Sequence, residues 1–280
     1  MGVTAEHLEG ATCVVTGGAS GIGLAMAERF AAAGMRLVLG DIDAAALDEA
    51  VARLGGDPDR VVGVGCDVRS IDDVRRLHDT AVERFGAVEV VCLNAGVAAA
   101  GLMAETDLDV WDWVLDVNLR GLIHGLHVFG PALAARGRGH VVITASAVGL
   151  SAAPTMAPYG TSKAAAVGLA SAARHELADS GVGVSALCPG LVDTRIFRSD
   201  RMRATGVPAA AADAEALHAY RDLVAEVGAP PSLVAEVVHR AVLDDQFFVF
   251  PTTDFDPAIE GQALAVQEGL AWRDALDLST

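Results

Sequence analysis

The sequence predicts an α/β fold with one doubly wound parallel sheet of about seven strands and helices on both faces. Short apolar runs rich in Val and Leu alternate with longer amphipathic segments. Such alternation is typical of parallel strands that are buried on both faces. Because crossovers between parallel strands are right-handed, it favours a doubly wound sheet. The expected strands are 11–16, 35–40, 60–66, 88–93, 140–145, 182–187 and 246–251.

Composition indicates a single domain. The 280 residues are 52% hydrophobic, and no linker rich in Pro, Gly or Ser divides them, so we expect one domain over 1–280. The net charge of −17 and the lack of a Lys/Arg-rich block argue against nucleic acid or an anionic membrane as a partner. Without a secretory signal or a run of about 18 apolar residues, we expect a cytoplasmic protein with no membrane span.

Four cysteines lie in or at the end of apolar, strand-like runs: Cys13, Cys66, Cys92 and Cys188. No C-x-x-C pair is present. We expect them to be small buried side chains in a reducing compartment, and we expect no metal site.

The first strand leads into a glycine-rich turn and a helix, in CVVTGGASGIGLAMA. Gly17, Gly21 and Gly23 allow a tight turn and a close approach of the backbone to a ligand. The helix that begins there presents free N–H groups and the positive end of its dipole to a pyrophosphate. A tight turn alone also explains the glycines, but their position after the first strand favours a dinucleotide site.

The second strand ends at Asp41. A carboxylate there can accept hydrogen bonds from an adenosine ribose 2′-OH, and it repels a 2′-phosphate. Ser20 and Ile42 supply no positive charge for such a phosphate, so we expect NAD in preference to NADP. The alternative for Asp41 is a loop acid or helix cap, a role that Asp43 fits better.

Polar residues follow the next two strands. Asp67 could accept a hydrogen bond from the adenine amino group. Asn94-Ala95-Gly96 lies at the same edge of the sheet, although turn formation alone explains it equally well.

Two helix starts and one interior asparagine mark the helices that follow these strands. Ser70 and Asp107 are expected to cap helices, the second of which is long and runs through Leu126. Asn118 lies inside that helical pattern, where Asn is mildly unfavourable. A bulge or an internal polar role would justify it, and surface exposure is the alternative.

Tyr159 and Lys163 stand four residues apart on a predicted helix, and Ser146 lies thirteen residues before the tyrosine. This spacing places Tyr159 and Lys163 on one face. A phenol titrates near pH ~10, and a neighbouring ammonium lowers its pKa, which predicts an acid/base that works at neutral pH. For the pair alone, an ordinary helix with an exposed lysine is the alternative.

Taken together, these motifs resemble the short-chain dehydrogenase/reductase family, over residues 8 to about 195. Leu93 departs from the pattern, since members often have Asn there, and the chain extends past the family minimum beyond residue 250. The residues that carry the resemblance are Thr16-Gly17-x-x-x-Gly21-x-Gly23, Asn94-Ala95-Gly96, Asn118, Ser146, Tyr159-x-x-x-Lys163 and Pro189-Gly190.

The resemblance implies a Rossmann-type fold and a catalytic role for four residues. Tyr159 would be the acid/base, and Lys163 would bind the nicotinamide ribose and depress the pKa of Tyr159. Ser146 would hydrogen-bond the reacting oxygen, and Asn118 would hold a water that links Lys163 to solvent. Motifs and resemblance together assign cofactor binding to Gly17, Ser20, Gly21, Ile22, Gly23, Asp41, Asp67, Val68, Asn94, Ala95, Gly96, Tyr159, Lys163, Pro189, Gly190, Val192 and Thr194.

The expected activity is NAD-dependent interconversion of a hydrophobic secondary alcohol and its ketone. The segments expected to line the cleft, 97–100, 148–150, 153–156 and Leu191, are small and apolar. An acyl-thioester, a hydroxy-acid derivative and a sugar are the other substrate classes considered. The alternative functions are an NADP-dependent 3-oxoacyl-thioester reductase and a non-catalytic dinucleotide-binding scaffold. The resemblance also implies a homotetramer or dimer, paired through helix 108–136 and the helix that carries Tyr159.

Two segments depart from the alternating pattern. Residues 191–230 read as helices and are expected to form a substrate lid. They include Arg195, Arg198, Arg201 and Arg203, which we interpret as a solvated face, with contact to an anionic substrate group as the alternative. The acidic tail, 252–280, has no assigned role; a helix that covers a neighbour or the cleft is one hypothesis.

Overall fold

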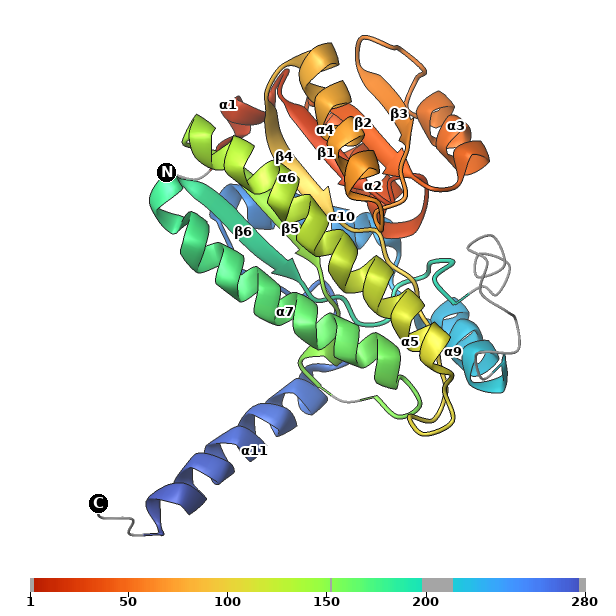
Figure 1. Ribbon diagram of the computed structural model, residues 1–280, viewed down its shortest axis with the longest axis vertical. Helices are drawn as coiled ribbons and strands as arrows, with labels where there is room; N and C mark the ends of the chain where they lie inside the picture. Colours follow the sequence, from red (N-terminus) through yellow and green to blue (C-terminus); the bar gives the residue numbers. More distant parts are fainter. Residues whose placement is uncertain (1–2, 152, 198–213, 277–280) are drawn as a thin grey trace.

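The computed structural model describes residues 3–151, 153–197 and 214–276. Its centre is one seven-stranded sheet in the order β3-β2-β1-β4-β5-β6-β7, in which all strand pairs are parallel (Figure 1). The order reverses between β1 and β4, which makes this edge the switch point where ligands bind in open α/β sheets. The strands are β1 (Thr12–Thr16), β2 (Arg36–Asp41), β3 (Val61–Gly65), β4 (Val88–Leu93), β5 (Gly139–Thr144), β6 (Val182–Leu187) and β7 (Phe248–Val249).

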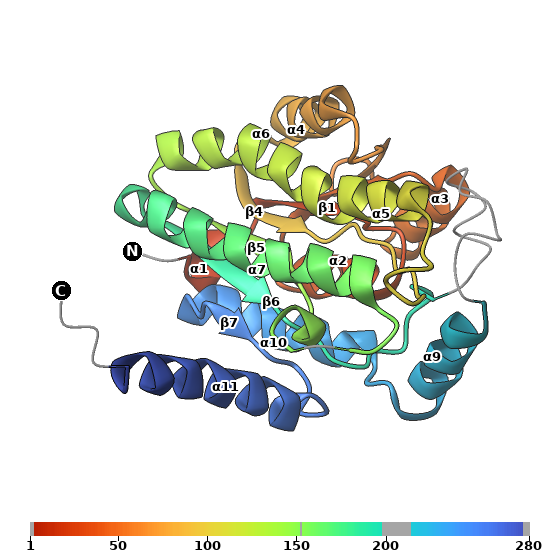
Figure 2. The same cartoon turned by 60° about the horizontal axis from the view of Figure 1, so that its bottom comes forward.

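Helices cover both faces of the sheet (Figures 1 and 2). On one face lie α2 (Gly21–Ala32), α3 (Ala44–Arg53) and α10 (Pro231–Asp244); on the other lie α4 (Ile71–Phe85), α6 (Gly121–Arg136) and α7 (Ala157–Leu177). Each face buries its own apolar layer, because the central strands are apolar on both sides. The remaining helices are α1 (Ala5–Leu8), α5 (Leu108–Leu115), α9 (Ala214–Val227) and α11 (Asp256–Asp274).

The expected strands are confirmed to within one or two residues at most ends. The last one is wrong in length: β7 has two residues, because only Ala186 and Leu187 of β6 pair with it. All four cysteines are free and buried.

The expected helix starts are confirmed in position. The Ser70 hydroxyl accepts a hydrogen bond from the Asp73 N–H at 3.3 Å, whereas the carboxylate of Asp107 forms no capping bond within the described residues. The long helix consists of α5, a π-helical turn (Asp116–Arg120) and α6. Among the described residues, no helix is both long and apolar enough to cross a bilayer.

The expected helices of the 191–230 insertion are confirmed in part. Residues 191–197 form turns instead of a helix, and α9 supplies the helical part of this segment. Residues 198–213, with Arg198, Arg201 and Arg203, lie outside the described residues.

Candidate active site

A cavity of about 390 Å³ opens at the carboxyl ends of the strands, beside the switch point. The residues that line it include ones from β2, β5 and α7 and from the segments that follow β1, β4 and β6. These parts of the chain are far apart in the sequence. Two residues predicted to belong to the site, Gly23 and Asn118, do not line the cavity. The predicted residues that line it are Gly17, Ser20, Gly21, Ile22, Asp41, Asp67, Val68, Asn94, Ala95, Gly96, Ser146, Tyr159, Lys163, Pro189, Gly190, Val192 and Thr194.

The glycine turn leaves no room for a side chain at Gly17 or Gly23. Gly17 and Gly21 adopt φ values of +64° and +54°, which L-residues rarely adopt. A Cβ at Gly17 would lie 2.9 Å from the Ala95 Cα, and one at Gly23 would lie 2.1 Å from the Gly17 carbonyl oxygen. The turn thus keeps bare backbone at the start of α2, where a helix N-terminus binds phosphate. This geometry fits the pyrophosphate of a dinucleotide.

Asp41 is buried at the rim of the cavity and shapes the neighbouring loops. Its carboxylate accepts hydrogen bonds from the Ala19 N–H at 3.0 Å and the Asp43 N–H at 3.1 Å. Asp43, not Asp41, caps the next helix, since its carboxylate accepts from the Ala46 N–H at 3.1 Å. Asp41 therefore places a fixed negative charge at the site expected for the adenosine ribose.

Asp67 faces the cavity in an ion pair that the sequence analysis missed. Arg69 binds its carboxylate with both Nε and Nη2, at 2.7–3.0 Å. Partial burial works to raise the pKa of Asp67, but the hydrogen bonds and charge of Arg69 outweigh it and the pKa is lowered. Arg69 lines the cavity as well, so the end of the cavity expected to hold adenine carries a paired charge.

Asn94 connects three strands at the floor of the cavity. Its N–H donates to the Thr16 hydroxyl at 2.9 Å, its Nδ2 donates to the Thr16 carbonyl at 3.2 Å, and its Oδ1 accepts from the Thr144 hydroxyl at 3.2 Å. Because these bonds join the ends of β1, β4 and β5, turn formation alone does not account for Asn94.

Asn118 is fully buried in the π-helical turn, which confirms the expected bulge and excludes surface exposure. Its Oδ1 accepts from the Val97 N–H at 2.8 Å, and its Nδ2 donates to the Val97 carbonyl at 2.9 Å and the Ser162 hydroxyl at 3.0 Å. The side chain therefore connects the segment after β4 to α7. Its role in holding a water stays a prediction.

Ser146, Tyr159 and Lys163 meet at the buried end of the cavity. Ser146 follows β5, and its hydroxyl donates to the Pro189 carbonyl at 3.3 Å and accepts from the Val148 N–H at 3.4 Å. The Lys163 Nζ donates to the Thr144 carbonyl at 2.8 Å and lies 5.6 Å from the centroid of the Tyr159 ring. Lys163 is 2% exposed, so its charge lies inside the protein.

Burial controls the pKa values of this pair. It raises the pKa of Tyr159 to about 12, and the neighbouring Ser146 hydroxyl, which works to lower that pKa, only partly opposes it. It also lowers the pKa of Lys163 to about 8, against the opposing effect of Cys188. Desolvation penalises both charged forms, so burial decides the direction of both shifts. The expectation that Lys163 depresses the pKa of Tyr159 stays a prediction.

These shifts predict the phenolate titration of the protein without cofactor. The chain has two tyrosines, so the difference in ultraviolet absorbance between wild type and Tyr159→Phe isolates Tyr159. We expect this difference to show no phenolate from Tyr159 up to about pH 10.5, because its pKa lies near 12. A Tyr159 phenolate with a midpoint at or below pH ~10 would show that Lys163 outweighs burial.

The segment after β7 holds the loop after β6, which the sequence analysis also missed. The Thr252 hydroxyl accepts from the Gly190 N–H at 3.1 Å, and the Asp254 carboxylate accepts from the Leu191 N–H at 2.7 Å. Phe255 lines the cavity itself. The pairing of β6 with β7 could have suggested this contact, since residues that follow neighbouring parallel strands meet at one edge.

The cavity has an aromatic rim. Phe197 and Tyr220 stack with ring centroids 5.5 Å apart, and the Tyr220 hydroxyl donates to the Pro154 carbonyl at 2.9 Å. Trp113 and Phe255 also line the cavity. Of the residues expected to line the cleft, Val97, Val148, Ala153, Met156 and Leu191 do so. The expectation is wrong for Ala98, Ala99 and Ala100, which are buried in the core, and for Gly149, Leu150, Pro154 and Thr155, which do not line the cavity.

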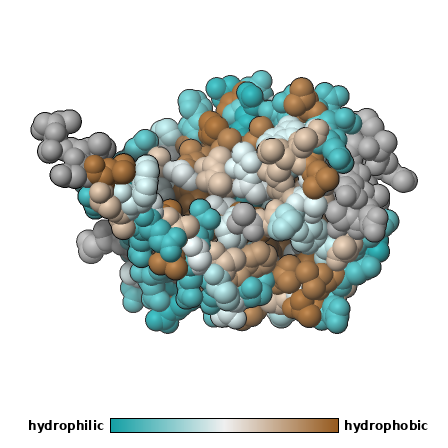
Figure 3. Space-filling model, turned by 90° about the horizontal axis from the view of Figure 1, so that it is seen from below, coloured by the Kyte–Doolittle hydropathy of each residue, from teal (hydrophilic) through white to brown (hydrophobic). Residues whose placement is uncertain are grey.

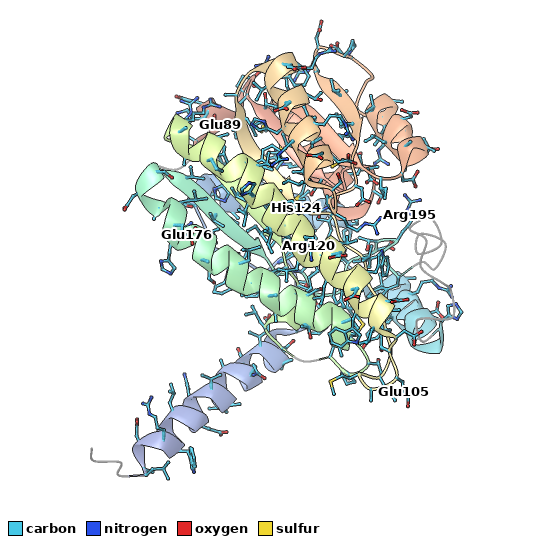
Figure 4. The ribbon with its side chains drawn as sticks, in the orientation of Figure 1. Glu89, Glu105, Arg120, His124, Glu176 and Arg195 are labelled. Atoms are coloured by element: carbon cyan, nitrogen blue, oxygen red, sulfur yellow. The ribbon has the colours of Figure 1, made fainter. Side chains whose placement is uncertain are left out.

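Of the four arginines noted in the 191–230 insertion, Arg195 lies among the residues that the structure describes. Arg195 lies in the turns between the sheet and α9 (Figure 4) and lines the cavity.

Comparison with known proteins agrees with this architecture. The family model for short chain dehydrogenases matches residues 11–204. The chain is 30% identical to C alpha-dehydrogenase of Sphingobium sp. strain SYK-6 over 261 residues, which cover 92% of this chain and 85% of that protein. It is 35% identical to 1-deoxy-11-beta-hydroxypentalenate dehydrogenase of Streptomyces avermitilis over 268 residues, 95% of this chain and 93% of that one.

The chain is also similar to a solved structure, both in sequence and in fold. A short chain dehydrogenase/reductase from Burkholderia phymatum in complex with NAD is 33% identical, with a TM-score of 0.86 over 93% of this chain and 96% of that chain. The protein belongs to the short-chain dehydrogenase/reductase family, and it is an oxidoreductase that acts on a small molecule.

Proposed function

We propose that the protein interconverts an apolar secondary alcohol and its ketone, with NAD as the cofactor. The observation that carries this proposal is the convergence of Ser146, Tyr159 and Lys163 in the cavity that the glycine turn borders. NAD supplies the hydride acceptor, at nicotinamide C4, when it is bound. The protein binds and orients the cofactor and the substrate, and its side chains transfer the proton.

The proton goes to Tyr159. In the oxidation direction the carbinol carbon loses a hydride, and the Tyr159 Oη, as phenolate, takes the hydroxyl proton, which leaves the ketone. Ser146 donates a hydrogen bond to the reacting oxygen, in the way that an oxyanion hole stabilises developing charge. Lys163 in its protonated form favours the phenolate and contacts the nicotinamide ribose. Asn118 holds the segment after β4 against α7 through its bonds to Val97 and Ser162. It thereby supports the helix that carries Tyr159 and Lys163.

NAD is favoured over NADP by Asp41. Its buried carboxylate stands at the end of β2, and the neighbouring rim residue Ile42 is apolar. A 2′-phosphate placed there would meet a negative charge of fixed position. In the relative from Burkholderia phymatum, the bound cofactor is NAD.

The change Asp41→Asn should raise the use of NADP relative to NAD. Removal of one negative charge removes its repulsion for the 2′-phosphate, and the amide oxygen can still accept one backbone N–H. We expect the ratio of kcat/KM for NAD to that for NADP to fall about tenfold or more, since 1.4 kcal/mol corresponds to a factor of ten. Asp43→Asn is the control, because Asp43 caps α3. An unchanged ratio in Asp41→Asn would contradict the assignment.

An apolar substrate fits the cavity rim. Trp113, Phe197, Tyr220 and Phe255 present ring surfaces, while Val148 and Met156 supply aliphatic ones. Such linings bind apolar ligands, with a few polar groups that fix orientation. The names of the Streptomyces and Sphingobium relatives also denote dehydrogenases.

A direct screen separates this function from a non-catalytic scaffold. Quenching of Trp fluorescence by NADH reports cofactor binding, since Trp113 lines the cavity. A panel of secondary alcohols, with NAD and with NADP, then reports turnover as absorbance of the reduced nicotinamide. Turnover of apolar alcohols with NAD supports the proposal. Cofactor binding without turnover of any alcohol or ketone supports a scaffold, and a preference for 3-oxoacyl thioesters with NADPH supports the reductase.

Cellular setting and assembly are part of the proposal. Four buried free thiols suit a reducing compartment, and we place the protein in the cytoplasm. We also propose a homo-oligomer that pairs through α5, α6 and α7, where Leu108 and Ile123 are exposed apolar side chains.

A further inference from the structure

The segment that follows β7 connects the site to the tail of the chain. It comprises residues 252–255, and we call it the post-β7 segment; helix α11 begins directly after it and projects from the body (Figures 1 and 2). Every residue from 261 to 276 is exposed and none of them lines the cavity, whereas Phe255 does. Contact between the tail and the site is therefore made by the post-β7 segment.

The loop after β6 runs along the cavity from one end to the other. At its start, the Pro189 carbonyl accepts a hydrogen bond from the Ser146 hydroxyl at 3.3 Å. At its end, Thr194 lies against the glycine turn, because a Cβ at Gly21 would lie 3.2 Å from the Thr194 Cγ2. A dinucleotide with its pyrophosphate at this turn and its reacting carbon near Ser146 would place its nicotinamide half along residues 189–194.

The middle of this loop is held from two sides. On one side the Asp254 carboxylate accepts a hydrogen bond from the Leu191 N–H at 2.7 Å, and the Thr252 hydroxyl accepts one from the Gly190 N–H at 3.1 Å. On the other side the Leu191 carbonyl accepts from the Ala229 N–H at 2.9 Å. Because a hydrogen bond to a charged acceptor is stronger than one to a neutral acceptor, the bond to Asp254 is the strongest of the three.

The glycine at position 190 makes room for Asp254. Its φ is not positive, so the backbone conformation does not require glycine there. A Cβ at this position would instead overlap both carboxylate oxygens of Asp254. Gly190 is therefore needed for the carboxylate to reach the Leu191 N–H.

Asp254 itself is exposed, in the segment that leads into α11. The root of α11 lies on the side of the molecule seen from below, where apolar and hydrophilic areas lie side by side (Figure 3). Because the side chain is at the surface, its replacement leaves no buried cavity and should change the stability of the fold little. A change in ligand binding can then be assigned to the loop.

We propose that Asp254 is a positioning residue for the nicotinamide half of the cofactor. It holds the Leu191 N–H, and with it the loop 189–194, in the place where the loop contacts that half. The inference rests on the proposed function in one respect, namely that the cavity binds a nicotinamide dinucleotide. The adenosine half would lie at Asp41, whose carboxylate is held by backbone N–H groups outside the post-β7 segment. Loss of the Asp254 carboxylate should therefore affect one half of the cofactor alone.

Calorimetric titration of the full chain with two ligands tests this role. NADH contains both halves of the cofactor, whereas ADP-ribose lacks the nicotinamide. In Asp254→Ala the affinity for NADH should weaken about threefold to tenfold, as expected for the loss of one hydrogen bond, and the affinity for ADP-ribose should stay within about twofold of wild type. Asp254→Asn should retain most of the NADH affinity, because its Oδ1 can still accept from the Leu191 N–H.

Steady-state kinetics supply a second readout. A nicotinamide that is held less closely is aligned less often for hydride transfer, so kcat of Asp254→Ala with the best alcohol of the panel should fall about tenfold. The thermal midpoint should change little, since the side chain is exposed. An unchanged kcat, or a kcat that falls only together with the thermal midpoint, would contradict a positioning role.

Asp256→Ala is the matched control. Asp256 lies in the first turn of α11, and its carboxylate makes no hydrogen bond or ion pair within the described residues. This variant should bind both ligands as wild type does. Equal weakening for NADH and ADP-ribose in Asp254→Ala, or no weakening for NADH, would overturn the role of Asp254 while leaving the proposed function in place. Failure of wild type to bind NADH would refute the proposed function, and this inference with it.

Discussion

The change Tyr159→Phe should lower the turnover of secondary alcohols by about 10²–10⁴ or more, which is the range contributed by a positioned acid/base. It removes one oxygen atom from a 9%-exposed side chain, so the ring still fills its place in the core. NAD should bind with little change in affinity, because the glycine turn and Asp41 stay intact. The two readouts are kcat with the best alcohol of the panel and NADH binding by Trp fluorescence.

Tyr220→Phe is the matched control. Tyr220 lines the same cavity, and its hydroxyl donates to the Pro154 carbonyl at 2.9 Å. Loss of the Tyr220 hydroxyl should affect KM more than kcat, since this hydroxyl is bonded to the Pro154 carbonyl and is not part of the Ser146, Tyr159 and Lys163 group. A Tyr159→Phe variant that keeps most of its turnover would disprove the acid/base assignment.

Lys163→Met should weaken NAD binding and turnover together while leaving the fold intact. Methionine keeps an apolar stem of similar volume, and replacement of a buried charge by an apolar group is often neutral or stabilising. What is lost is the ammonium that favours the Tyr159 phenolate and the hydrogen bond to the Thr144 carbonyl. We expect kcat to fall by about the factor seen for general acid–base groups, 10²–10⁴. Steady-state kinetics and NAD titration measure the two effects.

The pH dependence of stability provides a separate test of Lys163. Its folded pKa of about 8 lies below the unfolded value, so the unfolded chain binds more protons between the two. Wild type should therefore gain stability as the pH rises from about 8 towards 10.4, relative to Lys163→Met. Below pH 8 the cost of the buried ammonium is fully present. Parallel stability profiles for the two proteins would contradict the buried, shifted lysine.

The sequence predicted the sheet because its strands are continuous apolar runs. Runs such as 88–93 and 182–187 coincide with β4 and β6, since a strand buried on both faces is mostly apolar. Strand β7 was predicted too long because its length depends on pairing with Ala186 and Leu187, which no local pattern reveals.

The closeness of Tyr159 and Lys163 was predictable, and the residues around them were not. Tyr159 and Lys163 share a helix, so their spacing alone places them on one face. Thr252, Asp254 and Tyr220 reach the site from distant segments, and only the tertiary fold brings them there. The raised pKa of Tyr159 was not predicted, because the extent of burial is a property of the fold.

Transfer of deuterium tests the central claim most directly. The reagent is the best apolar alcohol of the panel with deuterium on its carbinol carbon, and the readout is the mass of the reduced cofactor. The account predicts that wild type produces NADH one mass unit heavier and that Tyr159→Phe produces almost none. Reduced cofactor without the label, or equal labelling by Tyr159→Phe, would contradict it.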